Sequence, residues 1–319
     1  MRRYATADRV TRRKKSTGED RAGAVLIAVL AITALAAAIT LEIAALVRVD
    51  GERIRSERDR LQAELYARDG LLAARLLLAA DRNGRDDLLE PWAQPLNLSR
   101  PGAKVAVRIR DTNRFFPIHT LVKPDGRLDI ARRDQLERLF ALLARPHNLA
   151  DRIADFIDPD DAPLANGAER DRYFAQDPPT LPNNRPLYHL SELGRVLGMT
   201  DEIDSDLVAR LTLFGSGSVN VNTAKPDVLA ALAPSLTLAD AGRIHSQARL
   251  HPFNAVEDVK PYTDLTDEEF AELAPYLSVS SDAYLVTATA KKGRAKVTLT
   301  AVLKRSPNGD LLLEREEIR

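Results

Sequence analysis

The residues best suited to chemistry are acidic side chains that crowd one short, loop-prone stretch of the chain. Carboxylate oxygens are hard ligands, and Ca²⁺ takes about six to eight of them in a flexible geometry. The Asp and Glu spacing of an EF-hand is missing from the sequence. Two interpretations stay open, a calcium site or a set of carboxylates that cap helices and stabilise turns. The acidic residues are Asp155, Asp158, Asp160, Asp161, Glu169 and Asp171.

Arrangements that support catalysis are missing from the sequence. The chain contains no cysteine, which excludes disulfides, thiolate metal sites and a cysteine nucleophile. Its histidines are scattered, and no two of them have the i, i+4 spacing of a helical zinc site. The run Gly215-Ser216-Gly217-Ser218 is neither a nucleophile elbow nor a P-loop, and we expect a flexible connection there. The sequence therefore predicts a protein that is not an enzyme.

Charge is balanced over the whole chain but not at its start. Lys and Arg together number 46, as do Asp and Glu, which argues against a dedicated nucleic-acid binder. A basic stretch occupies the first fifteen positions, and the run Ala24–Leu41 that follows it carries no charge. This run is close to the length that a helix needs to cross a bilayer. The positive-inside rule then keeps the N-terminus in the cytoplasm and sends the rest of the chain across the membrane.

Three kinds of N-terminal segment compete for this pattern. A cleaved secretory signal has a shorter apolar run with a small-residue site at its far end. A plain uncleaved anchor fits the length. A pilin-type signal is cut before the apolar run, after a glycine, and Gly23 followed by Ala24 lies at that boundary.

The elements that position the acidic stretch follow from hydrophobic periodicity. Leucines between Leu61 and Leu77 continue at helical spacing beyond the apolar run, and Val105, Val107 and Ile109 alternate as in a half-buried strand. Helical patterns then dominate as far as about residue 275, and alternating strands return in the tail. An α+β fold, with an antiparallel sheet interrupted by a large helical insertion, explains this order best.

One part of the helical stretch invites a different function. Residues 220–232, 241–249 and 253–259 look like a helix-hairpin-helix, a module that often grips the DNA backbone. DNA-binding versions offer backbone amides of a glycine-rich hairpin to phosphate. The hairpin here, residues 233–238, has no glycine, and Pro234 has no amide to donate. A membrane-anchored periplasmic DNA-binding or DNA-uptake protein is the alternative that this resemblance leaves open.

Three stretches of the chain match sequence motifs that occur together. Residues 153–161, then Gly167-Ala168-Glu169 and Tyr173, resemble the signature D-W-[ILV]-D-x-D … G-A-E … Y, with Phe156 in the place of Trp. Residues 190–199 resemble the segment SELxxVxGM, and residues 219–232 resemble NxNTAxxxVLxAL. In these motifs, and in their order and spacing, the chain resembles the K pseudopilins of the type II secretion system.

The resemblance implies a minor pseudopilin that acts as the tip or initiator subunit of the periplasmic pseudopilus. It implies a complex with the minor pseudopilins I and J, contacts with other pseudopilus subunits, anchoring in the inner membrane and no nucleic-acid partner. Ala28 stands where most pilins carry Glu, as is typical of K proteins. The implied parts are a prepilin leader (1–23), a transmembrane and stem helix (24–80), a pilin-like α/β part (81–130), an inserted helical domain of the SAM or helix-hairpin-helix kind (131–275) and C-terminal strands that complete the sheet (276–319).

The resemblance also implies two sites. Prepilin peptidase is expected to cut between Gly23 and Ala24, which leaves a methylated mature N-terminus. K pseudopilins bind calcium in the helical domain, which favours the calcium interpretation of the acidic stretch. The implied ligands are Asp155, Asp158, Asp160, Asp161 and Glu169.

Overall fold

The computed structural model describes residues 17–199 and 205–319 of the chain. Its first element is one long helix, α1 (Thr17–Ala80), and the chain divides into two compact units with the boundary between Asp59 and Arg60. In the first unit the apolar side chains from Val25 to Val49 are exposed. By length and composition, α1 is able to cross a membrane. The predicted basic leader falls largely on residues 1–16, which lie outside the described residues.

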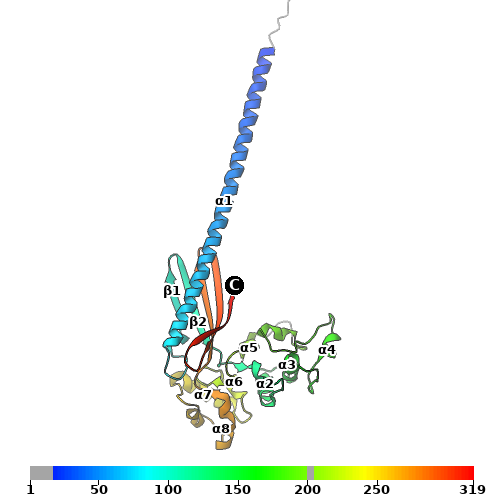
Figure 1. Ribbon diagram of the computed structural model, residues 1–319, viewed down its shortest axis with the longest axis vertical. Coiled ribbons are helices and arrows are strands. Elements are labelled where there is room, and N and C mark those ends of the chain that lie inside the picture. The colour runs from blue at the N-terminus through cyan, green and yellow to red at the C-terminus, as the bar shows by residue number, and fades with distance from the viewer. Residues whose placement is uncertain (1–16, 200–204) are drawn as a thin grey trace, which may run out of the picture. The chain divides into compact units, whose positions relative to one another are not determined.

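The second unit contains a five-stranded antiparallel sheet in the order β1-β2-β7-β8-β9 (Figure 1). β2 and β7 are direct neighbours in the sheet although residues 112–282 lie between them in sequence. The predicted α+β fold with an antiparallel sheet is therefore confirmed. The sequence does not predict β1, a short strand that pairs with β2. The strands are β1 (Leu96–Arg100), β2 (Ala103–Asp111), β7 (Ala283–Lys292), β8 (Ala295–Arg305) and β9 (Leu311–Ile318).

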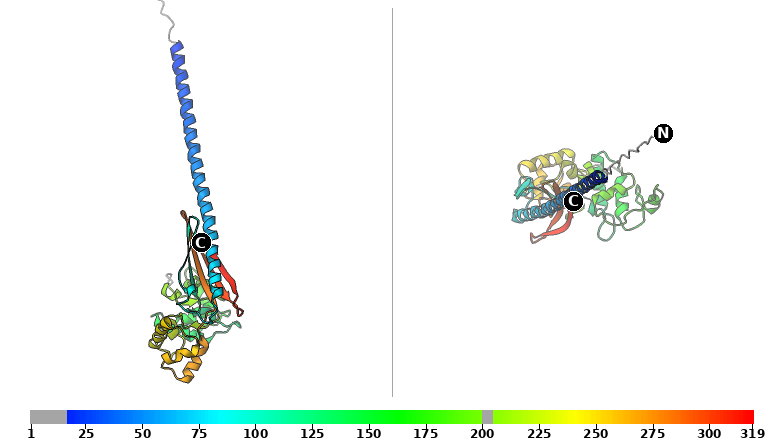
Figure 2. Two further views of the ribbon diagram at one scale, coloured as in Figure 1. Left: turned by 90° about the vertical axis from the view of Figure 1, so that its left-hand side faces the viewer. Right: turned by 90° about the horizontal axis from the view of Figure 1, so that it is seen from above.

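The last turns of α1 pack on one face of this sheet (Figures 1 and 2). Small residues on the helix, among them Ala63, Ala67 and Ala74, are fully buried against the strands. At Gly70 an added Cβ atom would lie 2.9 Å from both Ala288 and Val107, so only glycine permits this approach. The inward side chains of the strands, such as Val105 and Leu299, complete this first core.

The segment between β2 and β7 forms a second core from short helices. Phe116, Phe140, Phe156 and Tyr173 are buried in it. Two pairs of very short parallel strands join the start of the segment to its middle and its middle to its end. The helices are α2 (Ile130–Leu142), α3 (Leu149–Ile157), α4 (Arg170–Phe174), α5 (Ser205–Val208), α6 (Pro226–Ala230), α7 (Leu238–Leu250) and α8 (Asp267–Leu273), with 3₁₀ turns η2 (Ile118–Thr120), η3 (Leu190–Arg195), η4 (Val256–Tyr262) and η5 (Ala274–Tyr276). A further 3₁₀ turn, η1 (Pro91–Ala93), lies outside this segment, between α1 and β1. The short strands are β3 (Phe116–Pro117) with β4 (Leu211–Thr212), and β5 (Val219–Asn220) with β6 (Leu277–Ser278).

Local details differ from the sequence expectations at two places. Helix α2 ends at Leu142, ahead of Pro146, because Ala144 adopts a positive φ of 54° that breaks the helical path. The connection at 215–218 is a loop, as predicted, but it is anchored. Ser216 donates its amide to Asp282, and the Arg132 guanidinium donates to the Gly217 carbonyl at 2.6 Å. The domain limits at residues 131 and 275 stay predictions.

Candidate metal centre

Helix α3 ends in carboxylates. Asp155 lies in its last turn and Asp158 is its C-cap residue. The free backbone carbonyls of a helix C-terminus already place partial negative charge there. Acidic side chains at this end are therefore unfavourable unless a proton or a cation compensates them.

A third carboxylate reaches the same place from a separate element. Glu169, the N-cap residue of α4, joins Asp155 and Asp158 so that one oxygen of each lies within 4.8 Å of the others. All three residues are buried, with exposed fractions of 0% for Asp155 and 6% for each of the other two. Two short helices and the loop between them thus build a pocket of oxygen atoms shielded from water.

The hydrogen bonds around these carboxylates leave three of their six oxygens buried without a partner in the described part of the structure. Asp155 accepts from the amide of Leu164, at 3.1 Å for its Oδ2 atom. Among the described residues, Oδ1 of Asp158 and both carboxylate oxygens of Glu169 have no hydrogen-bond partner. A buried polar atom without a partner costs free energy, so these oxygens need either a proton or a cation.

The acid–base properties of the three groups are consistent with this need. Burial, together with repulsion from the neighbouring carboxylates, raises the pKa of Asp158 to about 7 and that of Glu169 to about 8. Burial also raises the pKa of Asp155 to about 6, although amide hydrogen bonds oppose the change. Oxygen ligands of this kind, held on a loop, suit a hard divalent cation such as Ca²⁺.

Gly167 is a structural requirement of the same site. A Cβ atom at this position would lie 1.7 Å from Oδ2 of Asp155, so the carboxylate occupies the space of the missing side chain. The Gly-Ala-Glu run therefore does two things, since Gly167 admits Asp155 and Glu169 supplies the third carboxylate. In the sequence this run is part of a motif, and the structure explains why its first residue has to be glycine.

Asp160 and Asp161, the two other predicted ligands, do not join this group. Both are exposed, and Asp160 accepts from the amide of Ala162 at 2.8 Å within its own turn. Asp161 accepts from the side-chain amide of Asn184 at 3.2 Å. Their charges nevertheless contribute to the raised pKa of Asp158 and Glu169.

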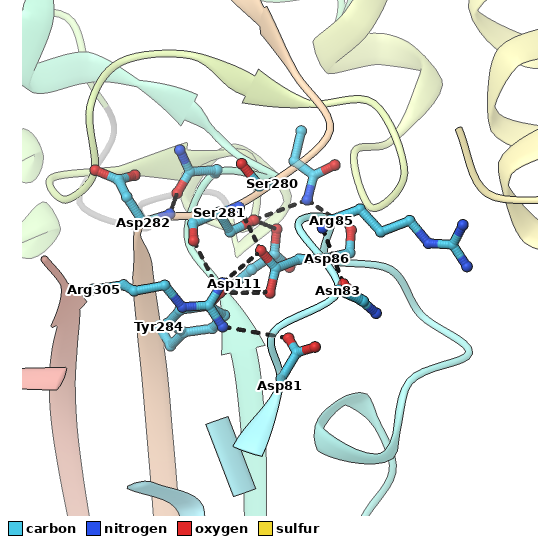
Figure 3. A network of polar contacts seen from close by, with 12 residues as sticks. Asp81, Asn83, Arg85, Asp86, Asp111, Ser280, Ser281, Asp282, Tyr284 and Arg305 are labelled. Carbon is cyan, nitrogen blue, oxygen red and sulfur yellow. Dashed lines mark hydrogen bonds and ion pairs between the residues drawn. The ribbon is translucent and has the colours of Figure 1, made fainter. Parts of the chain in front are cut away.

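A second acidic cluster, which sequence reasoning missed, has a different character (Figure 3). Asp81, Asp86 and Glu90 also place oxygens within 4.8 Å of one another. Asp86 is fully buried, but its carboxylate accepts from the amide of Ser281 at 2.7 Å, from the Tyr284 hydroxyl and from Arg305 at 3.0 Å.

The partners of the remaining groups make this cluster a structural network. Glu90 accepts from the Trp92 indole and from Asn83. Nearby, Asp111 accepts from the hydroxyls of Thr223 and Ser281 at 2.6 and 3.0 Å. The network joins the exit of α1, the end of β2 and the start of β7. Each of its carboxylates already has a donor, although Oδ1 of Asp111 has none among the described residues. The two acidic clusters therefore differ in how many of their carboxylate oxygens accept hydrogen bonds. A sequence pattern does not predict this difference.

Two family models, both described as type II secretion system (T2SS), protein K, match residues 115–214 and 219–280. The chain therefore belongs to the protein K family of the type II secretion system, whose members are minor pseudopilins.

Individual relatives agree with this assignment. A type II secretion system protein K of Klebsiella pneumoniae is 29% identical over 77% of this chain and 81% of its own length. A protein of the same description from Pseudomonas aeruginosa is 32% identical over 66% of this chain and 67% of its own length. A chain in the crystal structure of the GspK–GspI–GspJ complex from enterotoxigenic Escherichia coli covers 84% of this chain and 99% of its own, with a TM-score of 0.72 at 22% identity. That likeness shows the fold.

The DNA-binding alternative finds no support in these comparisons, and local structure argues against it. The amides at the start of α7 are the donors that a phosphate would use in a helix-hairpin-helix. Thr237 and Asp240 instead form a capping box there, in which the carboxylate of Asp240 accepts from the amide of Thr237 at 3.0 Å. Arg243, the nearby cation, pairs with Asp240 and Asp264. Side chains of the protein itself thus accept from the amides that a bound phosphate would need.

Proposed function

We propose that this minor pseudopilin is the tip or initiator subunit of a periplasmic pseudopilus and assembles with the minor pseudopilins I and J. The observation that carries this proposal is a row of exposed leucines on the stem part of α1. Leu61, Leu65, Leu72 and Leu76 are each more than half exposed. At 3.6 residues per turn they fall within about 60° of one another, on the side of the helix turned away from the sheet.

A row of this kind needs a partner. The opposite side of the same helix is buried through Ala63, Ala67 and Ala74, so the stem already has its own core contact. Exposed apolar residues in a continuous row mark an interaction surface. The partner that fits is another long amphipathic helix, such as the stem of a second pilin-like subunit. A relative of the same fold was crystallised with two other such subunits, GspI and GspJ.

The anchoring and processing of the chain follow from the same assignment. We infer that α1 inserts into the inner membrane with its N-terminus in the cytoplasm and the sheet and helices in the periplasm. Prepilin peptidase would cut between Gly23 and Ala24, and the new N-terminus would be methylated. Catalysis is not part of the proposed role, which is structural.

The cluster of Asp155, Asp158 and Glu169 is proposed to hold a structural calcium ion. Its unsatisfied buried oxygens and its position at a helix C-terminus support this assignment. Asp160 and Asp161, which lie beside it and are exposed, would raise the local negative potential that attracts the cation.

Mass spectrometry of the membrane-extracted protein tests the proposed function. A mature chain that begins at Ala24 with a methylated amine, and that co-purifies with pseudopilins I and J in detergent, is the expected result. A chain that retains Met1 and the basic leader would mean an ordinary anchored protein, and the pseudopilus role would be abandoned.

A further inference from the structure

Three arginines line a cavity at the edge of the sheet, and in the part of the chain that the structure describes none of them forms an ion pair. The cavity has a volume of about 200 Å³ and is lined by Arg108 and Arg110 of β2, by Arg114 of the following turn and by Trp92. Within the described residues, none of the three guanidinium groups makes an ion pair or a hydrogen bond. Arg114 contacts only the ring of Phe115, at 5.7 Å. The lining contains no carboxylate.

The backbone beside the cavity is a turn and not a strand. β1 pairs with residues 103–107 of β2 and begins at Leu96, so it does not reach the stretch from Arg108 to Asp111. On its other side this stretch pairs with β7 throughout. On the β1 side the turn η1 contacts β2, and Trp92 and Ala93 of that turn line the cavity together with Ile109. The arginine side chains, and not a free strand edge, are therefore what this part of the sheet offers to a partner.

We propose that this edge binds an extended acidic segment of a partner protein, whose carboxylates pair with the three arginines. Arg108 and Arg110 lie two residues apart on one face of a strand, which separates their Cα atoms by about 7 Å. Carboxylates at alternate positions of an extended peptide have the same spacing. Guanidinium forks bind such carboxylates bidentately.

The surface differs from the leucine row of α1 in place and chemistry. Asp111, the carboxyl group that follows Arg110 in β2, is fully buried, accepts hydrogen bonds from Thr223 and Ser281, and is absent from the cavity lining. The charge of Arg114 partly opposes the rise that burial causes in the pKa of Asp111, but Asp111 forms no ion pair with Arg108 or Arg110 in the described part of the structure. The charge of this edge is therefore available to a partner.

Trp92 makes the proposal directly measurable, because it is the sole tryptophan of the chain and lines the cavity. Tryptophan fluorescence of the full chain in neutral-lipid nanodiscs is titrated with an end-blocked peptide Glu-Thr-Glu-Val-Glu and with its Gln-for-Glu counterpart. The Glu peptide is expected to bind and the Gln peptide to leave the signal unchanged. The triple variant Arg108→Gln, Arg110→Gln, Arg114→Gln is expected to lose at least about tenfold in affinity.

A matched control separates a site from diffuse attraction. The triple variant Lys104→Gln, Lys291→Gln, Lys296→Gln removes the same charge from exposed residues of the same sheet, away from the cavity. It is expected to change the affinity less than about threefold. An equal loss in both triple variants, or equal binding of the two peptides, would overturn the proposal. Inorganic phosphate or anionic-lipid nanodiscs that give the same Arg-dependent signal at equal concentration would assign the site to a free anion or a headgroup instead.

Discussion

At the scale of single residues, the central feature is a set of buried carboxylates that the fold holds together without neutralising them. Oδ1 of Asp158 and both oxygens of Glu169 lack partners among the described residues, and the pKa of each group is raised. A raised pKa in the folded state means that the protonated form is favoured by folding. In the metal-free protein these groups therefore disfavour the folded state increasingly as the pH rises from the ordinary pKa of a carboxyl group toward about 8, whereas below that ordinary pKa they impose no such cost.

This gives a prediction for Glu169→Gln, which removes the group with the highest of these pKa values. In chelator, the variant should be more stable than the parent at pH 8, by about 1–3 kcal/mol, and its stability should depend less on pH. Calcium at about 100 times the dissociation constant should stabilise the parent by about 2.7 kcal/mol but not the variant. Thermal unfolding of the detergent-solubilised full chain measures both effects. The exposed Glu268→Gln serves as control and should behave as the parent, and equal calcium responses in all three proteins would disprove the site.

Gly167→Ala tests the same centre through sterics alone. Its Cβ atom would overlap the Asp155 carboxylate and force it out of the cluster. We expect calcium affinity, measured by isothermal titration, to fall by about 10- to 100-fold, as when a residue that orients a metal ligand is lost. Gly242→Ala is the matched control because nothing lies within 4 Å of its added Cβ atom. An unchanged calcium affinity in Gly167→Ala would remove Asp155 from the ligand set.

At the scale of elements, the stem helix and the sheet depend on one close approach. The added Cβ atom of Gly70→Ala would lie 2.9 Å from Ala288 and from Val107, so helix and strands would have to separate. We expect a loss of about 1–3 kcal/mol in the free energy of unfolding, as for other overpacked cores. Gly51→Ala on the same helix meets nothing within 4 Å and should be neutral or slightly stabilising. Chemical denaturation of the two variants compares them, and equal stabilities would contradict the tight helix–sheet contact.

The sequence predicts the elements whose hydrophobic residues recur with a clear period. It does not predict elements that form only because they pair with a distant part of the chain. The alternation of Val105, Val107 and Ile109 marks β2 in the sequence, whereas β1 is a short strand that depends on pairing with β2. In the candidate site the sequence supplied Asp155, Asp158 and Glu169 but could not separate them from the exposed Asp160 and Asp161. That separation depends on burial and on hydrogen-bond partners, and neither follows from spacing. The same limit hid the network around Asp86, whose donors Ser281, Tyr284 and Arg305 come from distant parts of the chain.

At the scale of the whole molecule, function depends on surfaces that the fold leaves open. α1 has two opposite faces in its stem part, one of small residues that packs on the sheet and one of exposed leucines. If the leucine face binds other stems, charge placed there should prevent assembly without unfolding the subunit. Because the stem's own core lies on the opposite face, the two effects are separable.

The variant Leu65→Glu, Leu72→Glu puts this to the test. Two buried carboxylates without partners in a helix–helix contact cost several kcal/mol, enough to reduce binding by at least about 100-fold. We expect co-purification with pseudopilins I and J to be lost and protein secretion to fail, while thermal unfolding of the subunit stays unchanged. Leu312→Glu, Leu313→Glu on the exposed part of β9 is the matched control and should assemble normally. Normal assembly of the stem variant would show that the leucine row is not the contact, and the partner helices would then have to bind another face of the subunit.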